Sequence, residues 1–360
     1  MTAAACVFLL PGDWNAATGG YGYDRRIAAG LRAAGWGVEV RSPGDAFPLP
    51  DTATLEIARD VVAALPDHAL VVADGLAFGT LPELVEAHAR RLRWVALVHH
   101  PLSFEAGLPD DVRRRLFDSE RRALAHARHV VVTSPSTARA LGAFDVPPSR
   151  VTVIEPGTEA APLATGSGAG AQALCLLCVA TVTTRKGHAV LVEALAGLAD
   201  RRWVLQCAGS LARDAAAVAA VQALVAQHGL QGRIVWHGEV DSARLDGLYA
   251  RADLFVLPSF HEGYGMALAE ALVRGLPVVS CAAGAIPDTV PPSAGLLVPP
   301  GDAAALQAAL RRVMDEAGLR TALAAGARAA GSRLPTWPQA VARFAAVLHQ
   351  VGEADEAAPP

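Results

Sequence analysis

The amino-acid sequence predicts an α/β protein built from two doubly wound domains. Its 360 residues exceed what one hydrophobic core usually serves. Short apolar runs that read as buried strands alternate with segments of helical periodicity, which is typical of parallel sheets with crossover helices. The alternation stops once, at the small and uncharged segment 161–172, and then starts again. Together these three observations indicate two parallel sheets, one on either side of that segment.

The N-terminal part opens with a strand, a glycine-containing loop, a helix and a second strand. We expect these elements at 4–10, 11–22, 23–34 and 36–41. The loop lacks the G-x-G-x-x-G spacing, and no acidic residue marks a dinucleotide ribose, which argues against a nicotinamide cofactor. Further helices are expected at 55–65, 81–91, 109–128 and 136–141, and further strands at 69–73, 94–98, 129–133 and 151–154.

The chain after the small-residue segment repeats the alternation. We therefore predict an N-terminal domain at 1–160, a linker at 161–172, a C-terminal domain at 173–335 and a last helix at 336–352. In the C-terminal domain, strands are expected at 173–179, 203–208, 234–236, 252–258, 277–281 and 295–298, and helices at 187–198, 212–228, 241–250, 266–274 and 302–314.

The composition narrows the classes of function. Lys and Arg total 31 against 35 Asp and Glu, so the chain lacks the basic excess of a nucleic-acid-binding surface. No apolar run approaches the roughly 18 residues of a membrane span, and the N-terminus lacks the basic region of a signal peptide. We therefore expect a cytoplasmic protein without a transmembrane span. Peripheral membrane contact stays open, because it needs no span and the helix at 109–128 is rich in arginine.

The five cysteines predict neither a disulfide framework nor a metal site. Cys175 and Cys178 have C-x-x-C spacing, but residues three apart in a strand face opposite ways. Each cysteine lies in an apolar, strand-like segment, so we interpret all five as small buried hydrophobes. An odd number of cysteines without a framework suits a reducing cytoplasm.

A strand, a glycine-containing loop and a helix around residue 262 give the most specific signal. The helix that begins near Met266 directs free N–H groups and a positive dipole end toward the loop, an arrangement that suits a phosphate. Glu262 and Glu270 are separated by seven residues, and each carboxylate can accept a pair of hydroxyl donors from a polyhydroxylated ligand. A surface helix beside an unrelated loop glutamate is the alternative interpretation. The predicted binding backbone consists of Gly263, Tyr264, Gly265, Met266 and Ala267.

Three further signals follow predicted strands. Arg185 and Lys186 place two cations in a loop between a strand and a helix, which suits a diphosphate. His99 and His100 follow the strand at 94–98, at the edge of a parallel sheet where ligands gather. We choose His99 as the functional histidine, with His100 as the open alternative. Gly20 belongs to a Gly-Gly pair in the first loop, where a simple turn is the other interpretation.

The stretch from Glu262 to Glu270 resembles the E-x7-E signature of the retaining glycosyltransferases of family 4, which have the GT-B fold. The resemblance implies two Rossmann-like domains facing across a cleft. The domain at 1–160 would lie on the acceptor side, 173–335 would bind the donor, and the helix at 336–352 would cross back to the first domain. In this family the arginine of the diphosphate site usually lies earlier, where this chain has Thr181, so Arg185 is the candidate substitute.

The resemblance also implies roles for the site residues. Glu262 would contact the donor-sugar hydroxyls, Glu270 the nucleotide ribose, and the 263–267 backbone the diphosphate and sugar. Lys186 and Arg185 would stabilise the leaving nucleotide. Gly20 would lie beside the diphosphate and the acceptor, and His99 near the donor sugar.

The predicted function is transfer of a sugar from a nucleotide-diphosphate sugar, UDP- or GDP-linked, to an acceptor with retention at the anomeric carbon. No Asp-x-Asp occurs in the chain, so we expect neither a metal nor another cofactor. The acceptor is unassigned and could be a sugar, a lipid-linked group or a small molecule. The alternatives are a nucleotide-sugar epimerase or phosphorylase of the same fold, or a catalytically silent sugar-nucleotide-binding protein.

Overall fold

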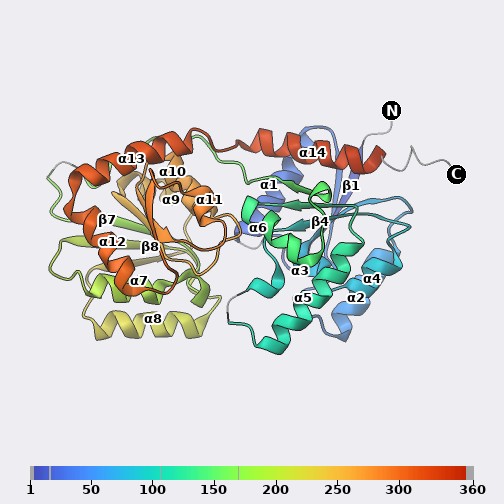
Figure 1. Ribbon diagram of the computed structural model, residues 1–360, viewed down its shortest axis with the longest axis horizontal. Helices are drawn as coiled ribbons and strands as arrows, with labels where there is room; N and C mark the ends of the chain where they lie inside the picture. Colours follow the sequence, from blue (N-terminus) through green and yellow to red (C-terminus); the bar gives the residue numbers. More distant parts are fainter. Residues whose placement is uncertain (1–3, 16–17, 106, 169, 354–360) are drawn as a thin grey trace. The chain divides into compact units, whose positions relative to one another are not determined.

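The computed structural model describes residues 4–15, 18–105, 107–168 and 170–353, and the chain divides into two compact units (Figure 1). The first unit comprises Met1–Gly157 and Pro335–Pro360, and the second comprises Thr158–Leu334. Each unit contains a six-stranded sheet in which every strand pair is parallel. The predicted α/β fold class, with two doubly wound units, is confirmed.

The first unit has the strand order β2-β1-β3-β4-β5-β6. Its central strands are continuous apolar runs, because both faces of a parallel sheet are covered by helices. The strands are β1 (Ala5–Leu9), β2 (Gly37–Arg41), β3 (Leu70–Asp74), β4 (Arg93–Val98), β5 (His129–Val132) and β6 (Val151–Val153). The helices are α1 (Gly19–Ala33), α2 (Thr52–Ala63), α3 (Gly75–Phe78), α4 (Pro82–Ala87), α5 (Asp110–Ala125), α6 (Pro135–Ala140) and α14 (Trp337–Glu353).

The C-terminal helix α14 packs on the first unit, against α1 (Figure 1). Gly30 of α1 allows this close approach, since a Cβ at that position would collide with Val341. The rings of Phe344 and Phe8 stack with their centroids 6.1 Å apart, which joins the helix to the core beneath β1. A segment far along the sequence thus adds buried side chains to the first unit.

The second unit has the strand order β12-β11-β10-β7-β8-β9. Its core is built from apolar strand residues, including the fully buried Phe255 and Val256 of β10. The strands are β7 (Leu174–Val179), β8 (Trp203–Ala208), β9 (Ile234–Gly238), β10 (Leu254–Leu257), β11 (Val278–Cys281) and β12 (Gly295–Val298). The helices are α7 (His188–Ala196), α8 (Ala215–Gln227), α9 (Ser242–Arg251), α10 (Met266–Val273), α11 (Ile286–Thr289), α12 (Ala303–Asp315) and α13 (Ala317–Gly331).

Two segments differ from the sequence-based expectation. The loop expected at 11–22 ends earlier, because α1 begins at Gly19, where the side chain of Thr18 accepts a hydrogen bond from the Tyr21 N–H at 3.3 Å and caps the helix. The segment 161–172 lies in the second unit. There the Ala164 N–H donates to the carbonyl of Arg274 at 2.9 Å, and the Thr165 N–H donates to that of Ala250 at 2.9 Å, so these backbone groups have partners in the same unit.

Among the described residues, no helix is both long enough and apolar enough to cross a membrane. All five cysteines carry free thiols, and four of them are buried.

Candidate functional site

Glu262 lies in the loop after β10 and is surrounded by polar partners. Its side chain is buried, and Lys186 Nζ lies 2.5 Å from Oε1. The hydroxyl of Ser259 donates to the same oxygen at 2.6 Å. Arg185 Nη1 lies 3.9 Å from Oε2. The structure therefore brings together the three charged residues that the sequence pointed to in two separate loops.

The two loops are held together by their backbones. The N–H of Phe260 donates to the carbonyl of Arg185 at 2.8 Å, and the guanidinium of Arg185 donates to the carbonyl of His261 at 2.8 Å. Gly187 has φ +71° at the start of α7, and a Cβ there would collide with the carbonyl oxygen of Pro258. A glycine is needed at this point because both the left-handed backbone and the close approach exclude a side chain.

The cations decide the charge state of Glu262. Burial alone would raise the pKa of this carboxyl, but the charges of Lys186 and Arg185, with the hydrogen bonds from Lys186 and Ser259, lower it below its usual 4.5. Glu262 is therefore ionised at neutral pH, and the ion pair leaves excess positive charge in the loop, since two cations face one carboxylate.

The glycine-containing segment leads directly into α10. Gly265 has φ +90° and occupies the N-cap position, so Met266 and Ala267 form the first turn with their amides at the positive end of the helix. The carbonyl of Tyr264 accepts from the Thr289 hydroxyl at 2.9 Å, which fixes the segment. Gly263 is the half-buried residue between Glu262 and this turn.

Glu270 lies in the second turn of α10 and is half-buried. The phenol of Tyr249 donates to its Oε2 at 2.9 Å, and the guanidinium of Arg274 covers the Tyr249 ring at 4.5 Å from the centroid. The second unit thus carries two carboxylates, two cations and a helix N-terminus in one segment and its neighbouring loop. Chemically, this arrangement can bind a ligand that has both an anionic group and several hydroxyls.

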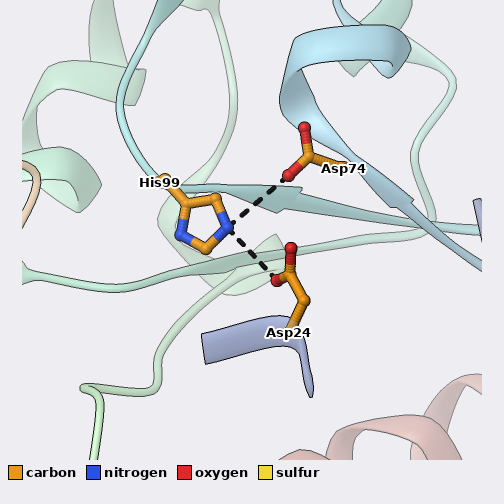
Figure 2. A group of neighbouring side chains, drawn as sticks. All are labelled: Asp24, Asp74 and His99. Carbon is orange, nitrogen blue, oxygen red and sulfur yellow. Dashed lines mark hydrogen bonds and ion pairs between the residues drawn. The ribbon is translucent and has the colours of Figure 1, made fainter. Parts of the chain in front are cut away.

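A second polar cluster lies in the first unit, where His99 follows β4 (Figure 2). Its Nε2 is 3.2 Å from Oδ1 of Asp24 on α1 and 3.5 Å from Oδ2 of Asp74 at the end of β3. Both aspartates are buried, whereas the His99 side chain is 22% exposed. The adjacent His100 pairs instead with Glu105, at 3.0 Å between Nε2 and Oε2.

The pKa values in this cluster shift upward. Burial raises the pKa of Asp74 to about 7, with the charge of Asp24 adding to the rise. Burial alone would lower the pKa of His99, but the charge and hydrogen bond of Asp24 and the charge of Asp74 raise it above 6.5. The donor atoms of the three side chains lie within 4.8 Å of one another, and of the described residues they are the group with the chemistry to hold a cation.

Gly20 lies against this cluster. A Cβ on Gly20 would be 3.3 Å from Cδ2 and 3.4 Å from Nε2 of His99, so α1 approaches the imidazole ring at its glycine pair. The sequence singled out His99 and Gly20 but missed Asp24, Asp74 and Ser259. Asp74 had a usable signal, since it ends a strand that neighbours the His99 strand, and the carboxyl ends of parallel strands meet at one edge.

Two family models match the chain. The model described as "Glycosyltransferase Family 4" matches residues 23–161, and the model described as "Glycosyl transferases group 1" matches residues 167–330. Together the two matches span most of both units.

Curated relatives carry similar descriptions. A D-inositol 3-phosphate glycosyltransferase of Xylanimonas cellulosilytica is 35% identical over 176 residues, which cover 49% of this chain and 42% of the relative. A protein of the same description from Salinispora arenicola is 30% identical over 66% of this chain and 60% of its own length. An MMP alpha-(1->4)-mannosyltransferase of Mycolicibacterium hassiacum is 27% identical over 84% and 76%, respectively. The chain spans about half the length of the first of these relatives.

Solved structures share the fold over nearly the whole chain. Sucrose-phosphate synthase from Thermosynechococcus elongatus superposes with a TM-score of 0.81 at 23% identity, covering 98% of this chain and 100% of that structure. Anabaena HepE in complex with UDP and glucose superposes with a TM-score of 0.78 at 18% identity, covering 96% and 100%. These similarities show the GT-B fold.

Proposed function

The chain belongs to the family 4 glycosyltransferases, and we propose that it transfers a sugar from a nucleotide-diphosphate sugar to an acceptor, with retention at the anomeric carbon and without a metal. The donor would bind in the second unit. The observation that carries this proposal is the clustering of Glu262, Lys186 and Arg185 beside the N-terminus of α10. Within that cluster the carboxylate suits sugar hydroxyls, and the cations and helix amides suit a diphosphate.

The chemistry requires charge stabilisation on the leaving group. As the bond between the anomeric carbon and the phosphate oxygen breaks, negative charge develops on the diphosphate. Lys186, Arg185 and the amides of Met266 and Ala267 would stabilise that charge, in a role that a metal ion serves in other enzymes. The acceptor oxygen would bond to the anomeric carbon on the same face, and its proton would pass to the departing phosphate oxygen, so the products are glycoside and nucleoside diphosphate.

Donor binding would rearrange the ion pair. In the structure Lys186 is 2.5 Å from Glu262, which leaves its ammonium directed at the carboxylate. We expect the diphosphate to share this ammonium, while Glu262 turns its second oxygen to the sugar hydroxyls. Glu270 would bind the ribose, with Tyr249 holding one of its carboxylate oxygens. Gly263, Tyr264 and Gly265 would supply the backbone between these contacts.

We also propose a donor nucleotide and a cellular location. HepE was solved with UDP, which makes UDP-sugars the first donors to test and GDP-sugars the second. The acceptor is left open among sugars, lipid-linked groups and small molecules. We propose a cytoplasmic location, which the free thiols support because reducing compartments keep cysteines unpaired.

A thermal-shift screen tests the donor site directly. The protein is heated with UDP-, GDP- and ADP-sugars, each with and without EDTA. At a hundredfold excess over Kd a ligand stabilises by about 2.7 kcal/mol, which corresponds to a rise of several degrees in Tm. We expect a shift with one nucleotide class that EDTA leaves unchanged. Glu270→Ala should lose most of the shift, whereas Glu193→Ala, an exposed residue of α7, should keep it.

Product analysis separates the reaction types. Transfer predicts release of nucleoside diphosphate only when an acceptor alcohol is added. An epimerase would convert the donor without an acceptor, and a phosphorylase would require phosphate. Donor binding with no turnover across a panel of acceptors would favour the silent binding protein, and activation by Mg²⁺ that EDTA abolishes would contradict the metal-free mechanism.

A further inference from the structure

His99 is held by acidic side chains from two different elements. Asp24 comes from α1, and Asp74 from the end of β3, beside the strand that delivers His99. The hydroxyls of Thr133 and Thr137 also donate to the His99 carbonyl, each at 3.3 Å, so the residue is fixed at its backbone as well. Two carboxylates at the ring and two hydroxyls at the backbone carbonyl are more polar contacts than a loop histidine needs for its own packing.

The geometry selects one tautomer of the imidazole. Ionised carboxylates only accept hydrogen bonds, and both aspartates face Nε2, so the proton belongs on Nε2. Figure 2 shows Nδ1 on the side of the ring away from both carboxylates. Asp74 is itself oriented, because its Oδ1 accepts from the Leu76 N–H at 2.7 Å and Oδ2 is left for the histidine.

The charge balance favours a second proton on the ring. Two buried carboxylates face a single imidazole, and Oδ2 of Asp24 has no hydrogen-bond partner among the described residues. With a neutral ring, a carboxylate ionised in this buried site would have no countercharge, which is costly. The pKa of Asp74, raised to about 7 by burial and by the charge of Asp24, reflects the same shortage of positive charge. The raised pKa of His99 agrees with this balance. Among the described residues, Tyr23 also lies against the ring, at 5.6 Å between centroids, and burial first of all raises its pKa well above 10, so it stays neutral.

We propose that Asp24 and Asp74 are positioning residues that hold His99 as an imidazolium, with Nε2–H directed to the two carboxylates and Nδ1–H directed outward as a hydrogen-bond donor to a substrate oxygen. The substrate role rests on the proposed sugar transfer, whereas the charge and tautomer of His99 do not depend on it. A donor at this position could bind a sugar hydroxyl or phosphate oxygen but could not take a proton from the acceptor.

Imidazole NMR of the intact protein tests the first half of the proposal. The nitrogen shifts of His99, assigned by comparison with His99→Gln, report its tautomer and its pKa. In the unchanged protein we expect His99 to titrate above 6.5 and to carry its proton on Nε2 when it becomes neutral. Asp24→Asn and Asp74→Asn should each lower that pKa by about one unit or more, because each removes an opposite charge. Asp60→Asn, an exposed site on α2, should leave it unchanged.

Three results would overturn the proposal: a His99 pKa at or below its ordinary value, a neutral ring protonated on Nδ1, or no change in the pKa in either asparagine variant. Zn²⁺ or Mn²⁺ that binds stoichiometrically and requires Asp24 and Asp74 would also overturn it, by showing that the three side chains form a metal site. The NMR titration of the wild-type protein still measures the pKa and tautomer of His99 if Asp24→Asn fails to fold.

Enzyme kinetics tests the proposed hydrogen bond from His99 to the substrate. Asp24→Asn should reduce kcat for transfer by about 10–100-fold through loss of ring orientation, while the donor KM and the donor-induced thermal shift stay unchanged. Its pH profile should lose activity at a lower pH than the unchanged protein, because the imidazolium deprotonates earlier. Transfer that keeps its rate and pH profile in Asp24→Asn would overturn the substrate role. If the NMR results hold but no nucleotide sugar is ever turned over, the proposed function fails and the assignment of the His99 charge stands.

Discussion

Two buried carboxyl groups in this chain, one in each unit, have neighbours that differ in charge. Glu262 in the second unit faces two cations, Lys186 and Arg185, and its pKa lies below 4.5. Asp74 in the first unit faces a second carboxylate, Asp24, and a single imidazole, and its pKa rises to about 7. Burial pushes both pKa values upward. The balance of neighbouring charges, rather than the depth of burial, therefore decides which carboxyl is ionised.

The two sites therefore respond oppositely to pH. A lowered pKa at Glu262 stabilises the folded state above about pH 4.5, and this contribution is lost as the pH falls through the folded pKa. At Asp74 and His99 the folded state binds more protons than the unfolded chain. Their contribution is therefore greatest at low pH and is lost as the pH rises through about 7. Acid should weaken the Glu262 site, whereas a rise in pH from about 4 through about 7 should weaken the cluster around Asp74 and His99.

The largest effect is expected for Glu262→Gln. The glutamine keeps the shape but leaves Lys186 and Arg185 without their carboxylate, and both cations are less than a third exposed. We expect a loss of about 3 kcal/mol in unfolding free energy at pH 7, at the lower end for a broken buried pair. Sugar transfer should fall about 10²–10³-fold, measured as nucleoside diphosphate released.

Glu193→Gln is the matched control for this variant, because it removes an exposed carboxylate from the same unit. Its urea unfolding should match that of the unchanged protein. For Glu262→Gln the difference in stability should shrink as the pH falls below about 4.5, where the wild-type carboxylate also becomes protonated. A difference that stays constant down to pH 3 would contradict the ion-pair explanation.

Gly187→Ala should give the next largest effect. This residue joins the cation loop to the Glu262 loop through a left-handed backbone and a close approach to the Pro258 carbonyl. The left-handed conformation costs an alanine about 1–2 kcal/mol, and the collision adds to that, so we expect about 2–3 kcal/mol in urea unfolding.

Gly229→Ala separates the two causes. Gly229 has φ +65° in the same unit, but a Cβ there would meet nothing within 4 Å. This variant should lose only the cost of the left-handed backbone, about 1–2 kcal/mol, and should therefore be more stable than Gly187→Ala. Equal losses in the two variants would show that the contact with Pro258 does not constrain the loop.

The Glu262 site in the second unit was easier to predict from the sequence than the His99 cluster in the first unit. Strand 252–258, Gly265 and the helix from Met266 are local signals, because a strand, a turn and a helix start are each specified by neighbouring residues. The pairing of Glu262 with Lys186 joins positions 76 residues apart and needs the sheet to be folded. The sequence could therefore name both residues, but it could not predict that they bind each other.

The His99 cluster could be predicted only in part, because it too joins residues that are distant in the sequence. Asp24 is one acidic residue on an amphipathic helix, and nothing in its local pattern distinguishes it from a solvated position. Asp24 is buried in the folded protein, where its carboxylate meets His99 after β4 and lies beside Asp74 at the end of β3. Helix α13 (Ala317–Gly331) was missed because its alanines and glycines give weak apolar periodicity. Two of its glycines allow close packing: Gly326 lies against the Ser293 carbonyl and Gly331 against that of Leu272.

Asp74→Asn should change the pH dependence of stability, with a smaller effect than the variants above. Removing this carboxyl removes the charge that the folded state resists at high pH, so the variant should gain stability relative to the unchanged protein as the pH rises from 5 to 8. The variant also removes a carboxylate that interacts with His99, and this loss opposes the gain. We therefore expect the free energy of unfolding, relative to wild type, to change by about 1–2 kcal/mol between pH 5 and pH 8. Urea unfolding at both pH values measures it, and Asp60→Asn provides the control. A change of the opposite sign would mean that Asp74 is ionised throughout.

Gly20→Ala and Gly22→Ala probe the same cluster with the smallest expected effect. Both residues lie in the first turns of α1, where alanine is favoured over glycine by up to about 1 kcal/mol. A Cβ on Gly22 meets nothing within 4 Å, so that variant should be slightly more stable and fully active. A Cβ on Gly20 would press on the His99 ring at 3.3 Å, so the helix gain should be cancelled and transfer slowed several-fold. Because the two substitutions are chemically identical, equal activity in both variants would show that the ring position is not critical, and it would remove the link between α1 and the chemistry at His99.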